Sequence, residues 1–376
     1  MRVTGDSSQT YREAGVDTAA GDLAVELMKS AVRRTHGPEV LGGVGGFAGL
    51  WDASALQGYR HPLLATSTDG VGTKVAIAQA LDKHDTIGQD LVGMVVDDIV
   101  VLGAKPLFLT DYIACGRVVP ERIAEIVGGI ARACEATGTA LVGGETAEHP
   151  GLIGPDDYDV AGAAVGAVEA DAVLGPERVR EGDVVLGLAS SGLHSNGFSL
   201  VRHILGTAGI GVEDRLDEFG GVVGEMLLTP TRLYTTPLLG LLDDEDLGAS
   251  VHAISHVTGG GIAANLARVL PRGAWTELDR SAWAVPEVFR TLSSIADTTL
   301  ESAEGTWNLG LGMLLVAAPA DAEAIGAALT AEGIPTAEIG RVNGADGAGR
   351  PAGDDWVEGA KGVDGGAVRL VGTYRG

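Results

Sequence analysis

The sequence predicts an α+β protein of two domains whose sheets are mixed rather than purely parallel. Its 376 residues suit two domains, because domains typically have about 100–200 residues. Apolar segments typical of strands alternate with amphipathic segments typical of helices, but not in the strict order of a parallel doubly wound sheet. A charged segment with proline and glycine, residues 169–183, separates the two halves, and we expect the domain boundary there.

In the first half, the sequence predicts a polar arm, residues 1–20, which is followed by helices. Residues 21–35 have apolar side chains on one face and basic residues in the last turn, where they complement the helix dipole. A long apolar segment, 86–103, ends at a glycine, and residues 120–137 open with proline at the first helical position. The expected strands of this half are residues 62–68, 106–114, 139–144 and 159–168.

The second half restarts with an apolar strand, residues 184–190, and a turn then leads into a helix at 197–205. A glycine triplet opens a further helix at 262–270, and residues 307–317 have the apolar pattern of a strand. A last edge strand is expected at 367–373. The expected organisation is an arm, 1–20, an N-terminal domain, 21–170, a C-terminal domain, 171–342, and a Gly- and Asp-rich tail, 343–376.

The composition excludes several classes of function. With 51 acidic and 26 basic residues the net charge is −25, so the chain lacks the positive surface of a nucleic-acid binder. Cys115 and Cys134 are too few for a disulfide framework or a four-thiolate zinc site. Because no apolar run reaches about 18 residues and no signal-peptide pattern opens the chain, we expect no membrane span and a cytoplasmic location.

Three carboxylates stand out. Asp97 and Asp98 lie in an apolar run that predicts a helix, where neighbouring side chains point about 100° apart. A carboxylate kept in a packed interior pairs with a cation or binds a metal, although a solvated helix rim is the simpler alternative. Glu145 follows a strand, in an acidic turn at 145–148. Mg²⁺ takes only one or two carboxylates beside phosphate oxygens, so three acids suit more than one ion.

A turn after the first expected strand combines the groups that bind a metal–triphosphate. Asp69 supplies a carboxylate, Gly70 and Gly72 permit close backbone approach, and Thr73 and Lys74 supply a hydroxyl and an ammonium group. The order differs from that of a P-loop, in which lysine precedes the hydroxyl residue. By itself, an ordinary tight turn is the simpler interpretation.

Other glycine loops are candidate anion cradles. Residues 42–46 loosely resemble a dinucleotide fingerprint, but they follow a helix rather than a strand, so we reject a Rossmann site. Within 190–197, His194 can serve as acid, base or charge stabiliser, or the loop simply caps a helix. Residues 258–261 precede another helix. Together these loops, the acids and the loop lysine indicate a Mg²⁺-dependent enzyme acting on ATP, with or without a second phosphorylated ligand, and do not name the acceptor.

These residues, in this order, resemble the phosphoribosylformylglycinamidine cyclo-ligase family, also called aminoimidazole ribonucleotide synthetases. The motifs that carry the resemblance are YREAGVD (11–17), PEVLGGVGGF (38–47), TDGVGTK (68–74), HDTIGQDLV (84–92), GAKPLFLTDY (103–112), LVGGETAEHPG (141–151), DYDVAGAAVG (157–166), SSGLHSNGFSLVR (190–202), HVTGGG (256–261) and TWNLGLGM (306–313). The resemblance implies the two-domain ATP-binding fold of that superfamily. It further implies a homodimer in which the N-terminal sheets form a barrel across the dimer, and a C-terminal α+β domain.

The resemblance also implies the reaction, the fifth step of de novo purine biosynthesis. Formylglycinamidine ribonucleotide and ATP give 5-aminoimidazole ribonucleotide, ADP and phosphate. ATP would phosphorylate the formyl amide oxygen, and the amidine nitrogen would then close the ring as phosphate leaves. The implied cofactors are ATP and Mg²⁺, with K⁺ as a further candidate. The implied partners are this small substrate and a second copy of the chain, with no nucleic acid and no membrane.

The resemblance assigns roles to individual residues. The implied catalytic residues are Lys74, Asp98 and His194, of which Lys74 would neutralise developing charge and His194 would stabilise or protonate near the transferred group. The implied metal ligands are Asp69, Asp98 and Glu145. The residues implied to bind ATP and its phosphates are Asp17, Asp69, Gly70, Gly72, Thr73, Lys74, Gly143 and Gly144. Those implied to bind the substrate are Gly43, Gly45, Gly46, Ser191, Asn196, Thr258, Gly259 and Gly260.

Some positions depart from the family pattern. Asp97 replaces the usual Asn, Trp307 replaces the usual Phe, and the tail beyond 343 matches no family motif. The extra charge of Asp97 leaves the metal and pH preference open. Two alternatives remain: a sister kinase such as thiamine-monophosphate kinase, and a non-enzymatic acidic metal-binding or scaffold protein. The second would bind Mg²⁺ without turning over nucleotide and leaves Lys74, His194 and the glycine loops unexplained together.

Overall fold

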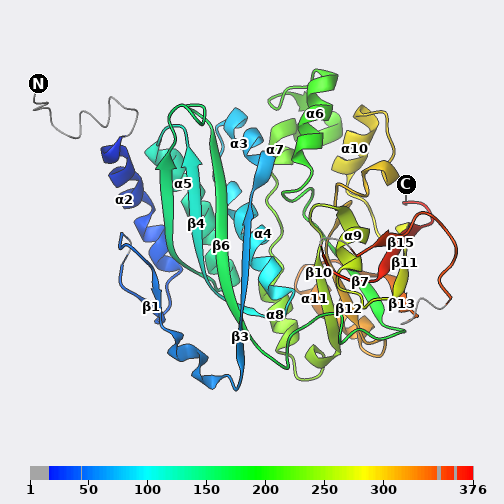
Figure 1. The fold of residues 1–376 in the computed structure, drawn as a ribbon. Coiled ribbons are helices and arrows are strands. Elements are labelled where there is room, and N and C mark those ends of the chain that lie inside the picture. The colour runs from blue at the N-terminus through cyan, green and yellow to red at the C-terminus, as the bar shows by residue number, and fades with distance from the viewer. Residues whose placement is uncertain (1–16, 44, 345–348, 360–361, 376) are drawn as a thin grey trace, which may run out of the picture. The chain divides into compact units, whose positions relative to one another are not determined.

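The computed structural model describes residues 17–43, 45–344, 349–359 and 362–375. This described part of the chain divides into two compact units (Figure 1). The first unit consists of the described residues up to Ile99 and of Pro106–Ala167. The second consists of Val100–Lys105 and of the described residues from Val168 onward. The expected arm mostly lies outside the described residues, and its last part, from Thr18, is already helical.

The first unit is a sheet backed by helices. Its strands lie in the order β3 (Pro62–Gly70), β6 (Tyr158–Glu169), β4 (Lys105–Cys115) and β5 (Ala140–Glu148). The helices are α2 (Thr18–Arg34), α3 (Val75–Leu81), α4 (Ile87–Val100) and α5 (Pro120–Thr137). In Figure 1, α4 and α5 lie behind the sheet, and α2 packs against α5. The opposite face carries exposed side chains, Leu64 and Tyr112 among them.

Local signals explain where these helices begin and end. Asp17 caps α2, because its Oδ1 accepts hydrogen bonds from the backbone N–H groups of Ala19 and Ala20 at 3.1 and 3.2 Å. The helix therefore starts at Thr18, before the expected residue 21. The helix predicted at 120–137 is confirmed as α5, which opens with Pro120 and ends before Gly138 at φ +64°.

The glycine loop of the first unit is the tip of a short hairpin. β1 (Val40–Leu41) pairs antiparallel with β2 (Leu50–Trp51), so the loop between them is closed at its base. The expectation of an acidic turn at 145–148 was wrong, because β5 continues to Glu148. The pairing of Cys115 with Glu148 at the end of β4 holds these residues in the sheet.

The second unit is a mixed sheet with helices on it. Its strands lie in the order β10 (Val251–His256), β12 (Leu311–Ala317), β7 (Val184–Ala189), β13 (Thr336–Asn343), β11 (Trp275–Asp279), β15 (Ala367–Val371) and β14 (Val357–Glu358). Neighbours are antiparallel except the parallel pair β11 and β15. The strand expected near the end of the tail is present as β15. It is not an edge strand of the sheet, because β14 pairs with its other side. The strand expected at 307–317 starts only at Leu311, because residues 307–310 form a loop.

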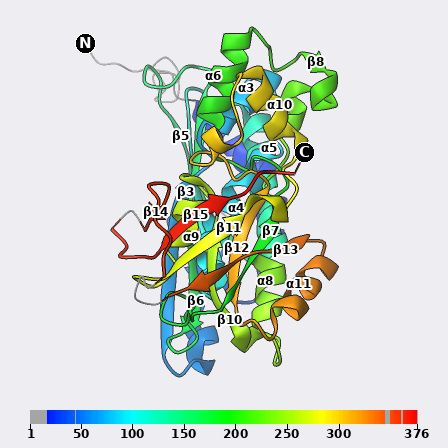
Figure 2. The same cartoon turned by 90° about the vertical axis from the view of Figure 1, so that its right-hand side faces the viewer.

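Helices cover this sheet and complete its core. The helices and the remaining short strands of this unit are α6 (Phe198–Ala208), β8 (Arg215–Leu216), β9 (Gly221–Val222), α7 (Val223–Leu227), α8 (Thr235–Leu242), α9 (Gly261–Ala267), α10 (Glu287–Ile295) and α11 (Ala322–Ala331). Figure 2 shows α8 and α11 on one side of the sheet. Leu238 of α8 and Ile325 of α11 pack there against Leu186 and Leu315 of the strands. None of the described helices combines the length and apolar character needed to cross a bilayer.

Candidate active site

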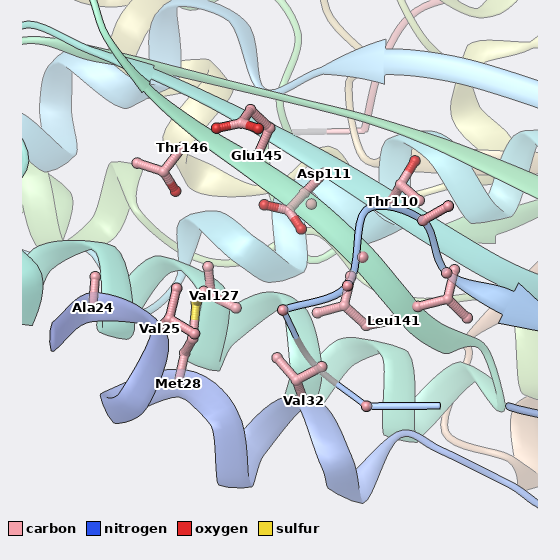
Figure 3. Close-up of a pocket in the computed structure, with 18 of the residues that line it drawn as sticks. Ala24, Val25, Met28, Val32, Thr110, Asp111, Val127, Leu141, Glu145 and Thr146 are labelled. Atoms are coloured by element: carbon pink, nitrogen blue, oxygen red, sulfur yellow. The ribbon is translucent and has the colours of Figure 1, made fainter. Parts of the chain in front are cut away.

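A cavity of about 600 Å³ lies in the first unit beside β4 and β5 (Figure 3). One wall is apolar and comes mainly from α2, with Ala24, Val25, Met28 and Val32. The tip of the β1–β2 hairpin forms another wall. Backbone and polar side chains at the ends of β4 and β5 complete the lining. The cavity therefore combines an apolar surface with hydrogen-bonding groups, as ligand pockets usually do.

Residues predicted to bind two different ligands line this one cavity. Gly43, Gly45 and Gly46, which the sequence assigned to the substrate, come from the hairpin. Gly143 and Gly144, assigned to ATP, and Glu145, assigned to a metal, come from β5. The fold brings the two sets together because the hairpin passes beside β5: a Cβ on Gly49 would lie within 3.0 Å of the Val142 side chain.

Asp111 of β4 also lines the cavity and is not among the residues predicted from the sequence. Its side chain is only 9% exposed, and burial raises its pKa to about 7. It pairs across the strands with Gly144, and a Cβ at that glycine would come within 2.7 Å of the Asp111 Cγ. Glycine at 144 thus leaves space for this carboxylate. A single acid in the apolar strand at 106–114 was the signal that could have identified it, by the argument applied to Asp97 and Asp98.

Lys74 lies inside the first unit rather than at its surface. The residue ends a 3-10 turn, Gly72–Lys74, that runs directly into α3, so its side chain is carried inward. Its Nζ lies 2.8 Å from Oδ1 of Asp90 in α4, and both side chains are fully buried. Burial lowers the pKa of Lys74, and the charge and hydrogen bond of Asp90 oppose that shift.

The carboxylates predicted as metal ligands occupy different elements. Asp69 is half-buried at the end of β3, and its Oδ1 accepts from the N–H of Gly70 at 2.7 Å. In α4, Asp97 is fully buried whereas Asp98 is partly exposed, which agrees with the expected divergence of the two side chains. Glu145 is exposed. Within the described ranges, no group of three or more acidic, His or Cys side chains is placed to hold a metal ion by itself.

Glu148 ties the start of α2 to the rest of the first unit. Its Oε2 accepts from the backbone N–H of Asp17 at 2.8 Å, and its Oε1 accepts from that of Val118 at 2.6 Å. Asp17, predicted to bind ATP, therefore has its backbone fixed here and its side chain occupied as the helix cap. Gly72 and Thr73, from the same prediction, are exposed, and Gly70 is half-buried.

In the second unit, His194 organises the loop between β7 and α6. The side chain is 1% exposed, the backbone adopts φ +59°, and its Nε2 accepts from the N–H of Ser191 at 3.2 Å. The ring and the Tyr234 hydroxyl occupy the space where Gly312 would carry a Cβ. The Ser191 hydroxyl donates to the carbonyl of Pro230 at 2.6 Å. His194 thus holds the loop from the inside.

Two predicted substrate loops are adjacent in this unit. A Cβ on Gly259 would lie 3.6 Å from Oδ1 of Asn196, so the loop before α6 meets the loop before α9. Gly260, at φ +104°, precedes α9, and Asn265 donates to the carbonyl of Thr258 at 3.2 Å. Asn196 and the 258–260 loop therefore form one polar surface, which agrees with a shared ligand.

Comparison with known proteins identifies the family. The model of the AIR synthase related protein, N-terminal domain, matches residues 52–168, and that of the C-terminal domain matches residues 180–350. The phosphoribosylformylglycinamidine cyclo-ligase of Xanthomonas campestris pv. campestris (strain B100) is 49% identical over 341 residues, 90% of this chain and 98% of that protein. The chain belongs to the phosphoribosylformylglycinamidine cyclo-ligase family. The resemblance stated from the motifs is therefore confirmed, and the chain is an enzyme of the ligase class in purine biosynthesis.

Further relatives agree with this cyclo-ligase assignment. The cyclo-ligase of Desulfitobacterium hafniense (strain DSM 10664 / DCB-2) is 47% identical over 335 residues, 89% of this chain and 97% of that protein. Among solved structures, thiamine-monophosphate kinase from Stenotrophomonas maltophilia K279a has a TM-score of 0.60 at 18% identity and covers 92% of this chain and 95% of its own. HypE in complex with ATP has a TM-score of 0.56 at 19% identity, covering 91% of this chain and 88% of its own. These structures confirm the two-domain α+β fold and carry no more than the fold.

Proposed function

We propose that the enzyme closes the ring of formylglycinamidine ribonucleotide to give 5-aminoimidazole ribonucleotide, with conversion of ATP to ADP and phosphate. The observation that carries this proposal is the 49% identity to a cyclo-ligase over 90% of the chain, through both units. An amide oxygen is a poor leaving group, and its phosphorylation makes it a good one. The amidine nitrogen then attacks the activated carbon and phosphate departs.

Asp69 and Asp98 would hold Mg²⁺ together with phosphate oxygens of ATP. Both are carboxylates with partly accessible side chains, and Mg²⁺ needs only one or two such protein ligands beside phosphate and water. Glu145 is a third candidate at the rim of the cavity. When bound, the ion would neutralise the charge of the triphosphate. A K⁺ requirement remains part of the proposal on the resemblance alone.

We propose positioning roles for Lys74 and His194, because both side chains are buried. Lys74 would hold the turn that starts at Asp69 against α4 through its ion pair with Asp90. His194 would fix the loop that carries Ser191 and Asn196. The exposed groups of that loop and of the 258–260 loop would then contact the substrate. Both roles differ from direct contact with the transferred phosphate.

The enzyme is further proposed to be a cytoplasmic homodimer. In the first unit, the sheet face with exposed Leu64 and Tyr112 lies opposite α4 and α5. Exposed apolar side chains on a sheet face favour contact with a second protein surface. A second copy of the same sheet would cover it, in the barrel arrangement that the family resemblance implies. The cytoplasmic location follows from ATP and the nucleotide substrate.

The decisive experiment follows ADP and 5-aminoimidazole ribonucleotide in one reaction. Purified enzyme with ATP and Mg²⁺ is assayed with and without formylglycinamidine ribonucleotide. Equal amounts of both products, formed only with substrate, are expected. ADP formation on thiamine monophosphate instead would assign the sister kinase activity, and Mg²⁺ binding without any turnover would favour the non-enzymatic alternative.

A further inference from the structure

The carboxylate of Asp111 is directed into the cavity of the first unit (Figure 3). Burial raises the pKa of Asp111, and its own backbone N–H opposes that shift. No cation among the described residues contributes. A buried carboxylate without a cationic partner is costly, and such a group is commonly retained to bind a ligand. The absence of a side chain on Gly144 keeps the space around it open.

The surroundings of Asp111 limit which part of a ligand can fit. Val32 of α2, Val127 of α5 and Leu141 of β5 provide an apolar lining near this carboxylate. Glu145 adds a second carboxylate at the exposed rim. The buried carboxylate of Asp111 disfavours a phosphate group beside it, whereas a flat ring with an N–H donor on one edge satisfies both the apolar wall and the buried acceptor.

We infer that this cavity binds the purine base of ATP and that Asp111 selects the base by accepting a hydrogen bond from its 6-amino group. The inference rests on the proposed function for the identity of the nucleotide. The second substrate fits the cavity less well, because its formyl and amidine groups are acyclic and polar and offer no flat apolar face. Asp111 is therefore a specificity-determining residue for the nucleotide.

The chemistry predicts discrimination between amino- and oxo-purines. At pH 8, above its raised pKa, the Asp111 carboxylate is ionised and has acceptors only, and the 6-oxo group of an inosine nucleotide is also an acceptor. An inosine nucleotide would therefore place an acceptor where the 6-amino donor was and leave only the neighbouring N1–H to donate to the carboxylate, which corresponds to about 10-fold weaker binding. An asparagine at this position presents both a donor and an acceptor and should accept either base.

The test measures binding of ADP and IDP to the whole enzyme by calorimetry at pH 8, without the second substrate. Wild type is expected to bind ADP at least about 10-fold more tightly than IDP. Asp111→Asn should reduce this ratio to about one. Thr146→Val is the matched control, since it also removes a polar group from the cavity lining, and should keep the wild-type ratio. Gly144→Ala, which displaces the Asp111 side chain, should lower the ratio and serves if the Asn variant does not fold.

The outcomes separate this inference from the proposed function. An unchanged ADP-to-IDP ratio in folded Asp111→Asn, or a wild type that does not distinguish the two nucleotides, would overturn the role of Asp111. If the ratio depends on Asp111 but formylglycinamidine ribonucleotide is not converted, the base pocket stands and the proposed reaction fails. If the reaction proceeds and the ADP-to-IDP ratio is independent of Asp111, the proposed reaction stands and the role of Asp111 fails.

Discussion

Lys74 and Asp90 form an ion pair with both side chains fully buried, Nζ lying 2.8 Å from Oδ1. Removal of one member of a buried pair usually costs about 3–5 kcal/mol, because the other charge stays in the interior. We expect Lys74→Met to lower the free energy of unfolding in urea by about that amount. Lys74→Met combined with Asp90→Leu should recover part of the loss.

The exposed pair of Arg117 and Asp156 is the control for that comparison. Its side chains are 60% and 73% exposed, and exposed pairs contribute about 0–1 kcal/mol. Arg117→Ala should therefore change the unfolding curve little. Equal effects of Lys74→Met and Arg117→Ala would contradict a structural role for the buried pair.

Asp111 should make stability depend on pH. Its pKa in the folded enzyme is raised to about 7 by burial, whereas an unfolded Asp titrates near about 3.9. Between these values the folded state holds a proton that the unfolded state has lost, so its contribution to stability falls as the pH rises through 7. Asp111→Asn should gain stability relative to wild type between pH 5 and pH 8, by about 3 kcal/mol. Urea titrations at both values test this, and a pH-independent difference would be the contrary result.

Asp97 and Asp98 are adjacent acids that should respond differently to the same substitution. Asp98 is partly exposed and is a proposed metal ligand, so Asp98→Asn should lower turnover at least about 100-fold. Asp97 is fully buried, and Asn is the usual family residue at its position, so Asp97→Asn should retain activity. Initial rates over a range of Mg²⁺ concentrations provide the measurement. Near-normal turnover of Asp98→Asn at saturating Mg²⁺ would remove that residue from the metal site.

Gly312 is expected to tolerate no side chain. A Cβ there would overlap the His194 ring and the Tyr234 hydroxyl, and overpacking of a core typically costs about 1–3 kcal/mol. Gly312→Ala should lower the thermal midpoint. Gly326→Ala, in α11 with its nearest neighbour at 3.8 Å, is the matched control and should be neutral or slightly stabilising. A similar response of the two variants would show that His194 is loosely held.

The proposed dimer can be tested on the sheet face opposite α4 and α5. Leu64 is 65% exposed in β3, and a charge introduced there should disfavour burial against a second copy. Leu64→Glu should therefore give a monomer mass in light scattering at micromolar concentration, whereas wild type gives a dimer. Met226→Glu, at a 40% exposed position of α7, should leave the mass unchanged. A monomeric wild type would refute the dimer directly.

Elements with their own local signals could be predicted from the sequence. The bounds of α5 follow from a proline at the start and a glycine after the end. The start of α2 was placed too late, because its cap, Asp17, falls in a segment that looks like a polar arm. The continuation of β5 to Glu148 depends on pairing with β4, which the local composition does not reveal.

The candidate site shows the same division between local and tertiary information. The glycines of the hairpin and of β5, predicted as binding residues because glycine-rich loops are visible in the sequence, line the cavity, and their ligands stay a prediction. The burial of Lys74 could not be predicted, because its partner Asp90 comes from another helix. Asp111 carried a signal, a single acid in an apolar strand, but its place beside a ligand-sized cavity is visible only in the assembled fold.

The C-terminal strand β15 has a consequence for the solubility of the enzyme. It covers one side of β11, and Arg369, which pairs with Glu277 of that strand, also lies 4.6 Å above the ring of Trp356. Without these residues, β11 would present unpaired backbone groups, which act as a template for association with other chains. The tail beyond residue 343, which matches no family motif, thus covers a side of β11 that would otherwise pair with other chains.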